Sequence, residues 1–411
     1  MRDNNTGYAY RIAVGTFIIS FVGIGMWQNC PGIFFQPVAD SLGIGRGQFT
    51  VYLSIQNIAN MITLLFAGKI MRKVKFRPLL TLSGLIAGGT FIMMSTFQSL
   101  YQFYFAGILL GVSMTFCGAM MVPVLINNWF RKRVGTLIGT AMACSSLGGA
   151  LFNPLISGII QNYGWRTGYL CLGGIGALIL LPVSAFVIRY RPVDVGLQPF
   201  GEENEQVLPD SGAPESLPGA SAAQALRSPS FYLLFMFVVG IVFMGNVTLS
   251  IPAYANSLGM SPSFGGIATS VMLTGGMFFK LALGWLNDKF GIVKAVLVAL
   301  ALGVTGIGLL IIAADAPVFL AGVALLGSGY ALSTVEPPIV TRKLFGLKDY
   351  NTIFSVITTA VFLTGALASP IYNTIYDMQK TYAPAFCFAI TAAVLGFACL
   401  LAALKKGERL V

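Results

Sequence analysis

The chain has 411 residues, of which 56% are hydrophobic and only 9% are charged. Because a soluble domain carries about 25% charged residues, this composition excludes an ordinary soluble protein and predicts one that lies in a membrane. The net charge of +11 does not indicate nucleic-acid binding, since the basic residues occur in short loops between apolar runs and so reflect membrane topology.

Apolar runs of membrane-spanning length recur along the whole chain, and about 20 helical residues are enough to cross the ~30 Å hydrocarbon core of a bilayer. We expect transmembrane helices at residues 10–35, 48–70, 78–97, 101–125, 135–161, 167–189, 230–255, 264–287, 292–314, 316–340, 350–376 and 382–404. The predicted fold class is therefore an all-α integral membrane protein with twelve transmembrane helices.

The distribution of Lys and Arg predicts the orientation of these helices. With the N-terminus in the cytoplasm, all 25 basic residues fall on the cytoplasmic side except Arg46, Arg166 and Lys380, which fall outside, and Lys280, which falls within a span. This is the bias described by the positive-inside rule. We therefore expect a multi-pass protein of the plasma or inner membrane with both termini in the cytoplasm.

One long polar segment interrupts the pattern after the sixth apolar run. Residues 191–228 are rich in Pro, Gly, Ser and acidic residues, a composition that cannot form a core and that predicts a flexible cytoplasmic linker. The linker divides the chain into two six-helix bundles, residues 1–190 and 229–411.

The two bundles repeat each other in sequence. At one fixed offset the Ala-x-Ser-Leu-Gly pattern of residues 39–43 matches residues 255–259, and Gly68 matches Gly284. Parallel six-helix repeats are a transporter architecture in which the substrate lies between the halves near the midplane. The same offset aligns Leu64 with Lys280, so the charge of Lys280 is an addition to one half of a pseudo-symmetric scaffold.

Lys280 is the only basic residue inside an apolar span. It lies eight residues before Asp288, or about 12 Å along a helix, and so near the middle of the membrane rather than at an interface to which its side chain could extend. A charge at that depth costs at least ~2.5–3.5 kcal/mol and is usually retained for function. We therefore expect Lys280 to bind an anionic ligand.

The Gly-x-x-x-Asp-Lys-x-Gly pattern of residues 284–291 resembles the loop motif of the major facilitator superfamily. Its counterpart in the first half is degenerate, with Arg72 in place of Asp and Lys75 in place of the last Gly. In that family the loop braces the cytoplasmic gate, so the resemblance implies a gating role for Asp288 and Lys289. It also implies the two-bundle fold of the family.

Other segments resemble the monocarboxylate and oxalate–formate branch of that family. These are the Asn-Trp-Phe-Arg-Lys-Arg of residues 128–133 and the Arg-Pro-Val-Asp-Val-Gly-Leu of residues 191–197. The branch carries a basic residue, usually Arg, eight positions before the loop Asp, where this chain has Lys280. The resemblance thus implies that Lys280 is the counter-charge of a carboxylate substrate.

Polar residues inside other apolar spans are candidates to line the substrate cavity. Gln28 and Asn29 precede a proline that can loosen the first helix, and Asn246, Tyr330 and Thr359 lie in the seventh, tenth and eleventh spans. The alternative for each is helix packing or, for Thr359, a hydrogen bond to its own helix. Thr359 stands where the oxalate-type members have a second basic residue, so the resemblance favours a monocarboxylate over a dicarboxylate.

Glu336 is the only acidic residue inside an apolar span, and two interpretations are open. It could be a proton-coupling site, or it could belong to an ion-pair network at the cytoplasmic gate with Arg342, Lys343 or Lys289. We favour the ion pair, because Arg342 follows by six residues, or about 9 Å of helical rise. Glu336 and Arg342 are thus predicted to act in gating or coupling.

The pattern as a whole predicts a secondary transporter that moves a small monocarboxylate by alternating access, with a proton or a counter-anion as the coupled ion. The lipid bilayer is its other partner, and we expect a monomer with no nucleic-acid partner. We expect no enzyme, cofactor or metal site, since the chain has no His and no phosphate-binding loop. The alternatives are a multidrug efflux pump on the same fold and a non-transporting membrane sensor.

Overall fold

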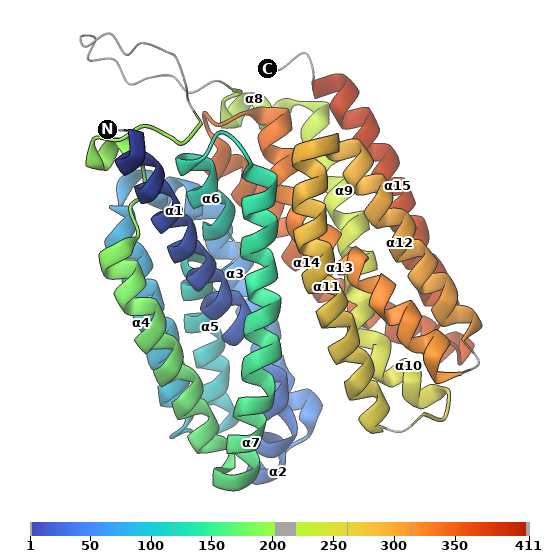
Figure 1. Cartoon of the computed structure of the whole chain (residues 1–411). Helices are drawn as coiled ribbons and strands as arrows, with labels where there is room; N and C mark the ends of the chain where they lie inside the picture. Colours follow the sequence, from blue (N-terminus) through green and yellow to red (C-terminus); the bar gives the residue numbers. More distant parts are fainter. Residues whose placement is uncertain (1, 119, 202–218, 261, 314, 408–411) are drawn as a thin grey trace.

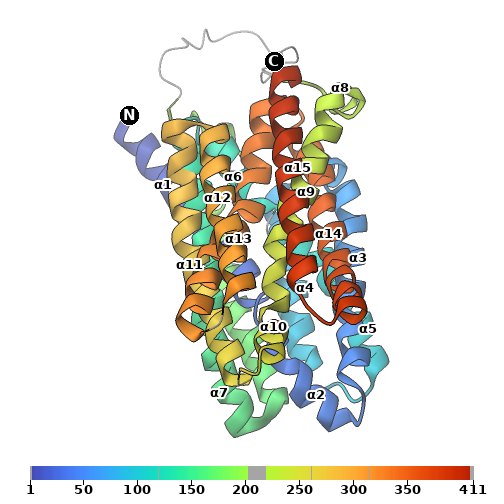
Figure 2. The ribbon, with the colours of Figure 1, turned by 90° about the vertical axis from the view of Figure 1, so that its right-hand side faces the viewer.

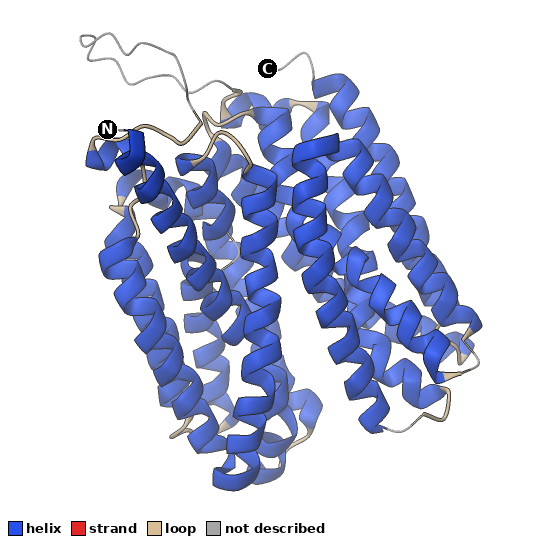
Figure 3. Cartoon of the chain, in the orientation of Figure 1, coloured by secondary structure: helices blue, strands red, loops and turns tan. Residues whose placement is uncertain are grey.

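The computed structural model describes residues 2–118, 120–201, 219–260, 262–313 and 315–407, and within these ranges the chain is built from helices (Figure 1; Figure 3). The first half contains α1 (Arg2–Ile19), the π-helix η1 (Ser20–Met26), η2 (Pro31–Phe34), α2 (Phe35–Leu42), α3 (Arg46–Lys73), α4 (Phe76–Met94), α5 (Leu100–Cys117), α6 (Met121–Trp129), α7 (Val134–Pro182) and η3 (Val183–Val187). The second half contains α9 (Pro229–Asn246), η5 (Val247–Ser250), α10 (Ile251–Ser257), α11 (Pro262–Phe290), α12 (Ile292–Ile312), α13 (Ala316–Phe345), α14 (Tyr350–Gln379) and α15 (Ala383–Gly407).

Eleven helical stretches of the described chain are long and apolar enough to cross a membrane. One of them, Val134–Val187, contains two predicted spans, because the helix breaks at Gly164, whose φ of 81° and ψ of 163° are not helical. Only glycine adopts this backbone region without strain. The break separates the predicted spans 135–161 and 167–189, so the order of predicted spans is kept.

The helices form two bundles that lie side by side (Figure 1). Within the first bundle α3 packs on α5 and α4 on α7, and within the second α9 packs on α15 and α12 on α13. The bundles meet mainly through two helix pairs, α7 with α11 and α3 with α14. The repeat in the sequence continues here, since α3 and α11 begin at Arg46 and Pro262, and α7 and α14 begin at Val134 and Tyr350, with the same spacing.

The first helix begins and the last helix ends at the same end of the molecule, beside the short linker helix α8 (Ala222–Arg227) (Figure 1; Figure 2). We call this the linker end. The ribbons of α7 and α11 lie close together there and diverge toward the opposite end (Figure 1).

Both ends of the linker are attached to the bundles. Phe200 pairs with the α6–α7 loop, where its amide donates to Trp129 O at 2.8 Å. On the other side the amide of Ala220 donates to Phe345 O at 3.0 Å, and α8 follows directly. The sequence analysis predicted a flexible linker and did not predict these attachments. They are formed by backbone groups, which the amino-acid composition does not reveal. Residues 202–218 lie outside the described part.

Candidate functional site

Lys280 lies in the middle of α11 with its side chain fully buried. Its Nζ donates to Ser146 Oγ at 2.9 Å and to Met142 O at 3.3 Å, and it has a longer contact of 3.5 Å to Ser145 Oγ. All three acceptors belong to α7 in the other half. The ring of Tyr330 lies 4.4 Å from the Nζ, within cation–π range. Among the described residues the ammonium group therefore has only neutral partners.

Two glycines bring Lys280 to these acceptors. A Cβ atom on Gly139 would lie 2.5 Å from Lys280 O, and one on Gly284 would lie 2.5 Å from Gly135 O. Because these positions have no side chain, the backbones of α7 and α11 touch. This close approach lets one lysine side chain reach across the boundary between the halves.

Asp288 joins the same two helices at the linker end. Its carboxylate accepts from the amide of Gly135 at 2.9 Å and from the amide and hydroxyl of Thr136 at 2.7 and 2.6 Å. These amides are the unpaired donors of the first turn of α7, so Asp288 caps a helix of the opposite half. Its negative charge also stabilises the N-terminal end of the helix dipole. The contact joins the two halves at the position where the loop motif implied a gate.

The other predicted gate residues separate into two groups. Arg342 contributes a second contact between the halves, because its Nη1 donates to Asn127 Oδ1 at 2.7 Å. Lys289 is exposed, and its Nζ lies 4.7 Å from the centre of the Trp285 ring. Lys289 thus stacks on its own helix, while Asp288 and Arg342 join the halves.

Glu336 is not part of the ion-pair network that the sequence spacing suggested. Its side chain is fully buried, and its Oε1 accepts from Asn287 Nδ2 at 2.6 Å. Its Oε2 has no hydrogen-bond partner in the described structure. The separation of six positions between Glu336 and Arg342 turns an α-helix through about 600°, so the two side chains point to different faces of α13. The spacing in the sequence indicates how far Arg342 lies from Glu336 along the helix axis, but it does not bring the two side chains to the same face of the helix.

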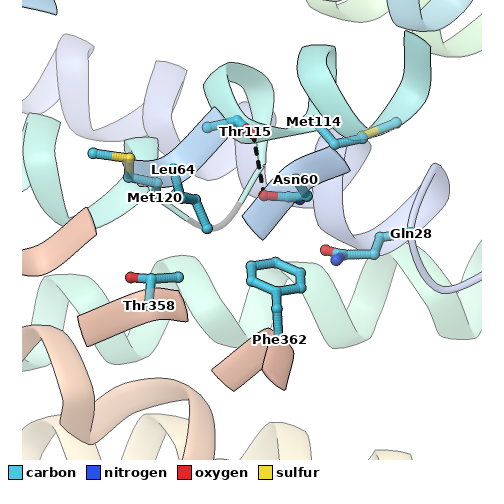
Figure 4. Close-up of a pocket in the computed structure, with 8 residues that line it drawn as sticks. All are labelled: Gln28, Asn60, Leu64, Met114, Thr115, Met120, Thr358 and Phe362. Atoms are coloured by element: carbon cyan, nitrogen blue, oxygen red, sulfur yellow. Dashed lines mark hydrogen bonds between the residues drawn. The ribbon is translucent and has the colours of Figure 1, made fainter. Parts of the chain in front are cut away.

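A cavity opens between the halves near Gln28 (Figure 4). It contains about 230 Å³ of empty space, part of it open to solvent, and Thr115 Oγ1 donates to Asn60 Oδ1 at 3.1 Å in its wall. The lining residues come from the first half and from α14: Gln28, Asn60, Leu64, Met114, Thr115, Met120, Thr358 and Phe362. The sequence analysis missed Asn60 and Thr115; the available signal was the group of amide side chains inside the span 48–70, namely Gln56, Asn57 and Asn60.

The remaining predicted residues lie outside this lining. Asn29 is half-buried against Gly149 of α7. Asn246 Nδ2 donates to Val242 O at 2.9 Å, and Thr359 Oγ1 donates to Val356 O at 2.6 Å, both within their own helices. The structure therefore brings Lys280 together with Tyr330 and places Gln28 at the cavity, and it does not bring Asn246 or Thr359 to either.

The sequence model of the family named Major Facilitator Superfamily matches residues 16–369 of this chain, and it matches a second time over residues 233–409. The chain belongs to the major facilitator superfamily. The prediction of this family and of its two-bundle transporter fold is thereby confirmed, and the chain is a multi-pass membrane transporter.

Among relatives, this major facilitator is 22% identical to monocarboxylate transporter 12 of Homo sapiens over 428 aligned positions, which cover 98% of this chain and 82% of the relative. It is 26% identical to monocarboxylate transporter 1 of Bos taurus over 229 positions, which cover 53% of this chain and 42% of that one. An uncharacterised transporter of the same type from Bacillus subtilis, YcxA, is 24% identical over 178 positions, or 43% of each chain. The predicted resemblance to the monocarboxylate branch is confirmed.

Solved structures of the superfamily have the same fold. The proton:xylose symporter XylE superposes with a TM-score of 0.73 at 14% identity, over 98% of both chains. The transporter FucP in its outward conformation superposes with a TM-score of 0.69 at 14% identity, over 95% of this chain and 97% of that one. At this identity the likeness concerns the fold.

Proposed function

We propose that this major facilitator transports small monocarboxylates by alternating access, with Lys280 as the counter-charge of the substrate. The observation that carries the proposal is a fully buried ammonium group at the boundary between the halves with only neutral acceptors around it. Such a charge is costly in a membrane, and a carboxylate would compensate for it. The relatives named monocarboxylate transporters support this substrate class.

The geometry suggests how an anion would bind. A carboxylate entering between α7 and α11 would replace Met142 O as a partner of the ammonium group, and the hydroxyl of Ser146 could donate to it, whereas that of Ser145 donates to Met142 O at 2.6 Å. Charge-assisted hydrogen bonds of this type are roughly twice as strong as neutral ones. The rest of the substrate would extend toward the cavity near Leu64, the repeat counterpart of Lys280 in the other half.

Because Lys280 contacts α7 across the boundary, substrate binding would also weaken one contact between the halves. The other ties, Asp288 on α7 and Arg342 on Asn127, lie at the linker end. We assign this end to the cytoplasm from the positive-inside bias, which places both termini there and makes the described state one that is closed toward the cytoplasm. We assign the protein to the plasma or inner membrane as a monomer.

Uptake into proteoliposomes tests the proposal. Labelled acetate, lactate, pyruvate, benzoate and oxalate would be offered to the wild type, Lys280→Ala, Lys280→Arg and Lys280→Gln. Loss of one partner of a buried charge pair costs roughly 2–5 kcal/mol, so we expect Lys280→Ala to bind the transported monocarboxylate about 30- to several-thousand-fold more weakly. Lys280→Arg keeps part of the activity, because the charge remains.

Lys294→Ala is the matched control, since Lys294 is an exposed lysine on α12 and its loss should leave uptake unchanged. Equal affinity of Lys280→Ala and the wild type for the transported anion would overturn the role of Lys280. Absence of uptake of every carboxylate by a correctly folded wild type would overturn the substrate class.

A further inference from the structure

Glu336 on α13 and Asn287 on α11 form a pair of buried polar side chains between the two helices. Both side chains are buried, and Asn287 Nδ2 donates to Glu336 Oε1 at 2.6 Å and to Leu283 O at 2.9 Å. These two bonds fix the orientation of the amide, because its oxygen cannot face the carbonyl of Leu283. The second carboxyl oxygen of Glu336 has no hydrogen-bond partner in the described structure. An ionised carboxylate so placed would leave a bare buried oxyanion, which is highly unfavourable.

Within the described part of the chain, no charged side chain forms a hydrogen bond with the Glu336 carboxyl group. Lys280 binds α7 acceptors, Arg342 binds Asn127, and Asp288 caps α7. Tyr350, from α14, donates its hydroxyl to Pro338 O. Of the other helices that pack on α13, which are α7, α9, α12 and α15, none contributes a buried charged side chain among the described residues. A neutral carboxylic acid, with its proton on Oε2, is less costly here than a bare oxyanion because it buries no charge.

The pair is also placed where a proton could be exchanged and coupled. Asn287 precedes Asp288, so Glu336 lies directly behind the contact that joins α11 to α7 at the linker end. Asn287 is seven residues after Lys280, which brings it to the same face of α11 about 10 Å along the helix axis. Separation of the halves at the linker end would break the Asp288 contact and give water access toward Glu336.

We propose that Glu336 is the proton-binding site of the transport cycle, and this inference rests on the proposed carboxylate transport. The step is the reversible protonation of one side chain, in which the carboxylate oxygen Oε2 takes up one H⁺ and releases it again. A substrate anion at Lys280 repels an ionised Glu336, so the anion favours the protonated form. By linkage, the protonated form favours the anion. Unit charges about 10 Å apart in a medium with an effective dielectric constant of about 20 change each other's binding by about tenfold.

Glu336→Gln tests the site, because glutamine has the shape of the protonated acid and cannot release a proton. We expect this variant to keep exchange of labelled for unlabelled lactate across the vesicle membrane. We expect it to lose the proton flux into pyranine-loaded proteoliposomes that a lactate gradient drives in the wild type. In the wild type, the affinity for lactate should increase as the pH changes from alkaline to acidic. This increase should exceed the corresponding change in the variant by about tenfold. Any effect of Lys280 itself cancels in the comparison, because both proteins retain it.

Asp315→Asn is the matched control. Asp315 lies before the first residue of the same helix and accepts from Val318 N at its exposed end, a role that asparagine also performs. The proton flux of the Asp315→Asn variant should equal that of the wild type. If Glu336→Gln still moves protons with lactate at the wild-type ratio, Glu336 is not the proton site.

Infrared spectroscopy of the wild type tests the same proposal without a mutation. Glu336 is the only glutamate within the apolar spans, since the others are Glu202, Glu203, Glu205, Glu215 and Glu408. At neutral pH we expect a carbonyl band of a protonated acid that shifts when glutamate is labelled with ¹³C. Absence of that band overturns the proposal even if Glu336→Gln does not fold. If the wild type takes up lactate without a proton flux, only the proposed proton site is contradicted. If it transports no carboxylate at all, the proposed function is contradicted.

Discussion

Two helix pairs join the halves, α7 with α11 and α3 with α14, and the sequence repeat relates one pair to the other. Both pairs approach closely at a glycine. A Cβ atom on Gly284 would lie 2.5 Å from Gly135 O, and one on Gly68 would lie 2.5 Å from Thr352 Oγ1. Both pairs therefore share a close approach at the repeated glycine, and they differ in the side chains around it.

The side chains at mid-depth differ completely. In the first pair Lys280 contacts Ser145 and Ser146. The repeat counterparts of these three residues are Leu64, Val361 and Phe362, and Leu64 and Phe362 line the cavity (Figure 4). One pair thus has a charged contact at the depth where the other has an apolar wall.

The ends of the helices differ in the same way. Asp288 caps α7 across the boundary, while the counterpart of Asp288 is Arg72, which cannot cap a helix N-terminus. At the start of α14, Asp349 accepts from the amide of Ala222 at 2.8 Å, so a linker residue contacts that position. At these positions α7–α11 is therefore the polar contact and α3–α14 the apolar one.

Lys280→Leu makes the first pair resemble the second and should have the largest effect. We expect loss of lactate binding by about 30- to several-thousand-fold, because the counter-charge is removed. Adding Leu64→Lys to this variant moves the cation to the counterpart position. It should not restore binding, since Val361 and Phe362 offer no hydroxyls. Recovery of wild-type affinity in the double variant would show that the two pairs are equivalent; binding is measured by calorimetry in detergent.

Gly139→Ala tests whether close approach is needed in the polar pair. The added methyl group would lie 2.5 Å from Lys280 O, so α7 and α11 must separate, at a cost of about 1–3 kcal/mol. We expect a lower thermal unfolding temperature and weaker lactate binding. Gly158→Ala on the same helix is the control, since nothing lies within 4 Å of a Cβ there. Equal destabilisation by both variants would contradict the contact.

Asp288→Ala should open the linker end. Loss of a helix cap costs about 0.5–2 kcal/mol, which corresponds to a shift of up to about 30-fold in the balance of closed and open states. Spin labels at Lys132 and Lys348, in a chain whose native cysteines are replaced, would report a longer distance. Arg72→Asp places an acid in the second pair and should shorten that distance. An unchanged distance in both variants would contradict a gating role for these positions.

Replacement of residues 202–218 by a Gly/Ser segment of equal length should have the smallest effect. The closure entropy of a Gly/Ser segment depends mainly on its length, so a replacement of equal length should keep uptake within about twofold of the wild type. The attachments at Phe200 and Ala220 are kept in this variant. A complete loss of uptake in a correctly inserted protein would assign a specific role to the replaced segment.

Several site features could not be read from the chain. The ion pair expected for Glu336 failed because a spacing of six residues gives the depth of two side chains but not their direction on the helix. Asn60 and Thr115 are far apart in the sequence and meet only because α3 packs on α5. Thr359 was selected in the eleventh span, whereas Thr358 is the residue that lines the cavity; one residue changes the helix face by about 100°.

The sequence by itself determined the membrane class, the order of the spans, the two-fold repeat and the depth of Lys280. These depend on hydrophobicity, length and charge bias, which act locally along a chain in a bilayer. Only the tertiary structure decided which partners the buried polar groups have. Ser146 for Lys280, the first turn of α7 for Asp288 and Asn287 for Glu336 all come from other helices, because contacts between helices depend on packing angles and helix rotation, which are set by the whole bundle.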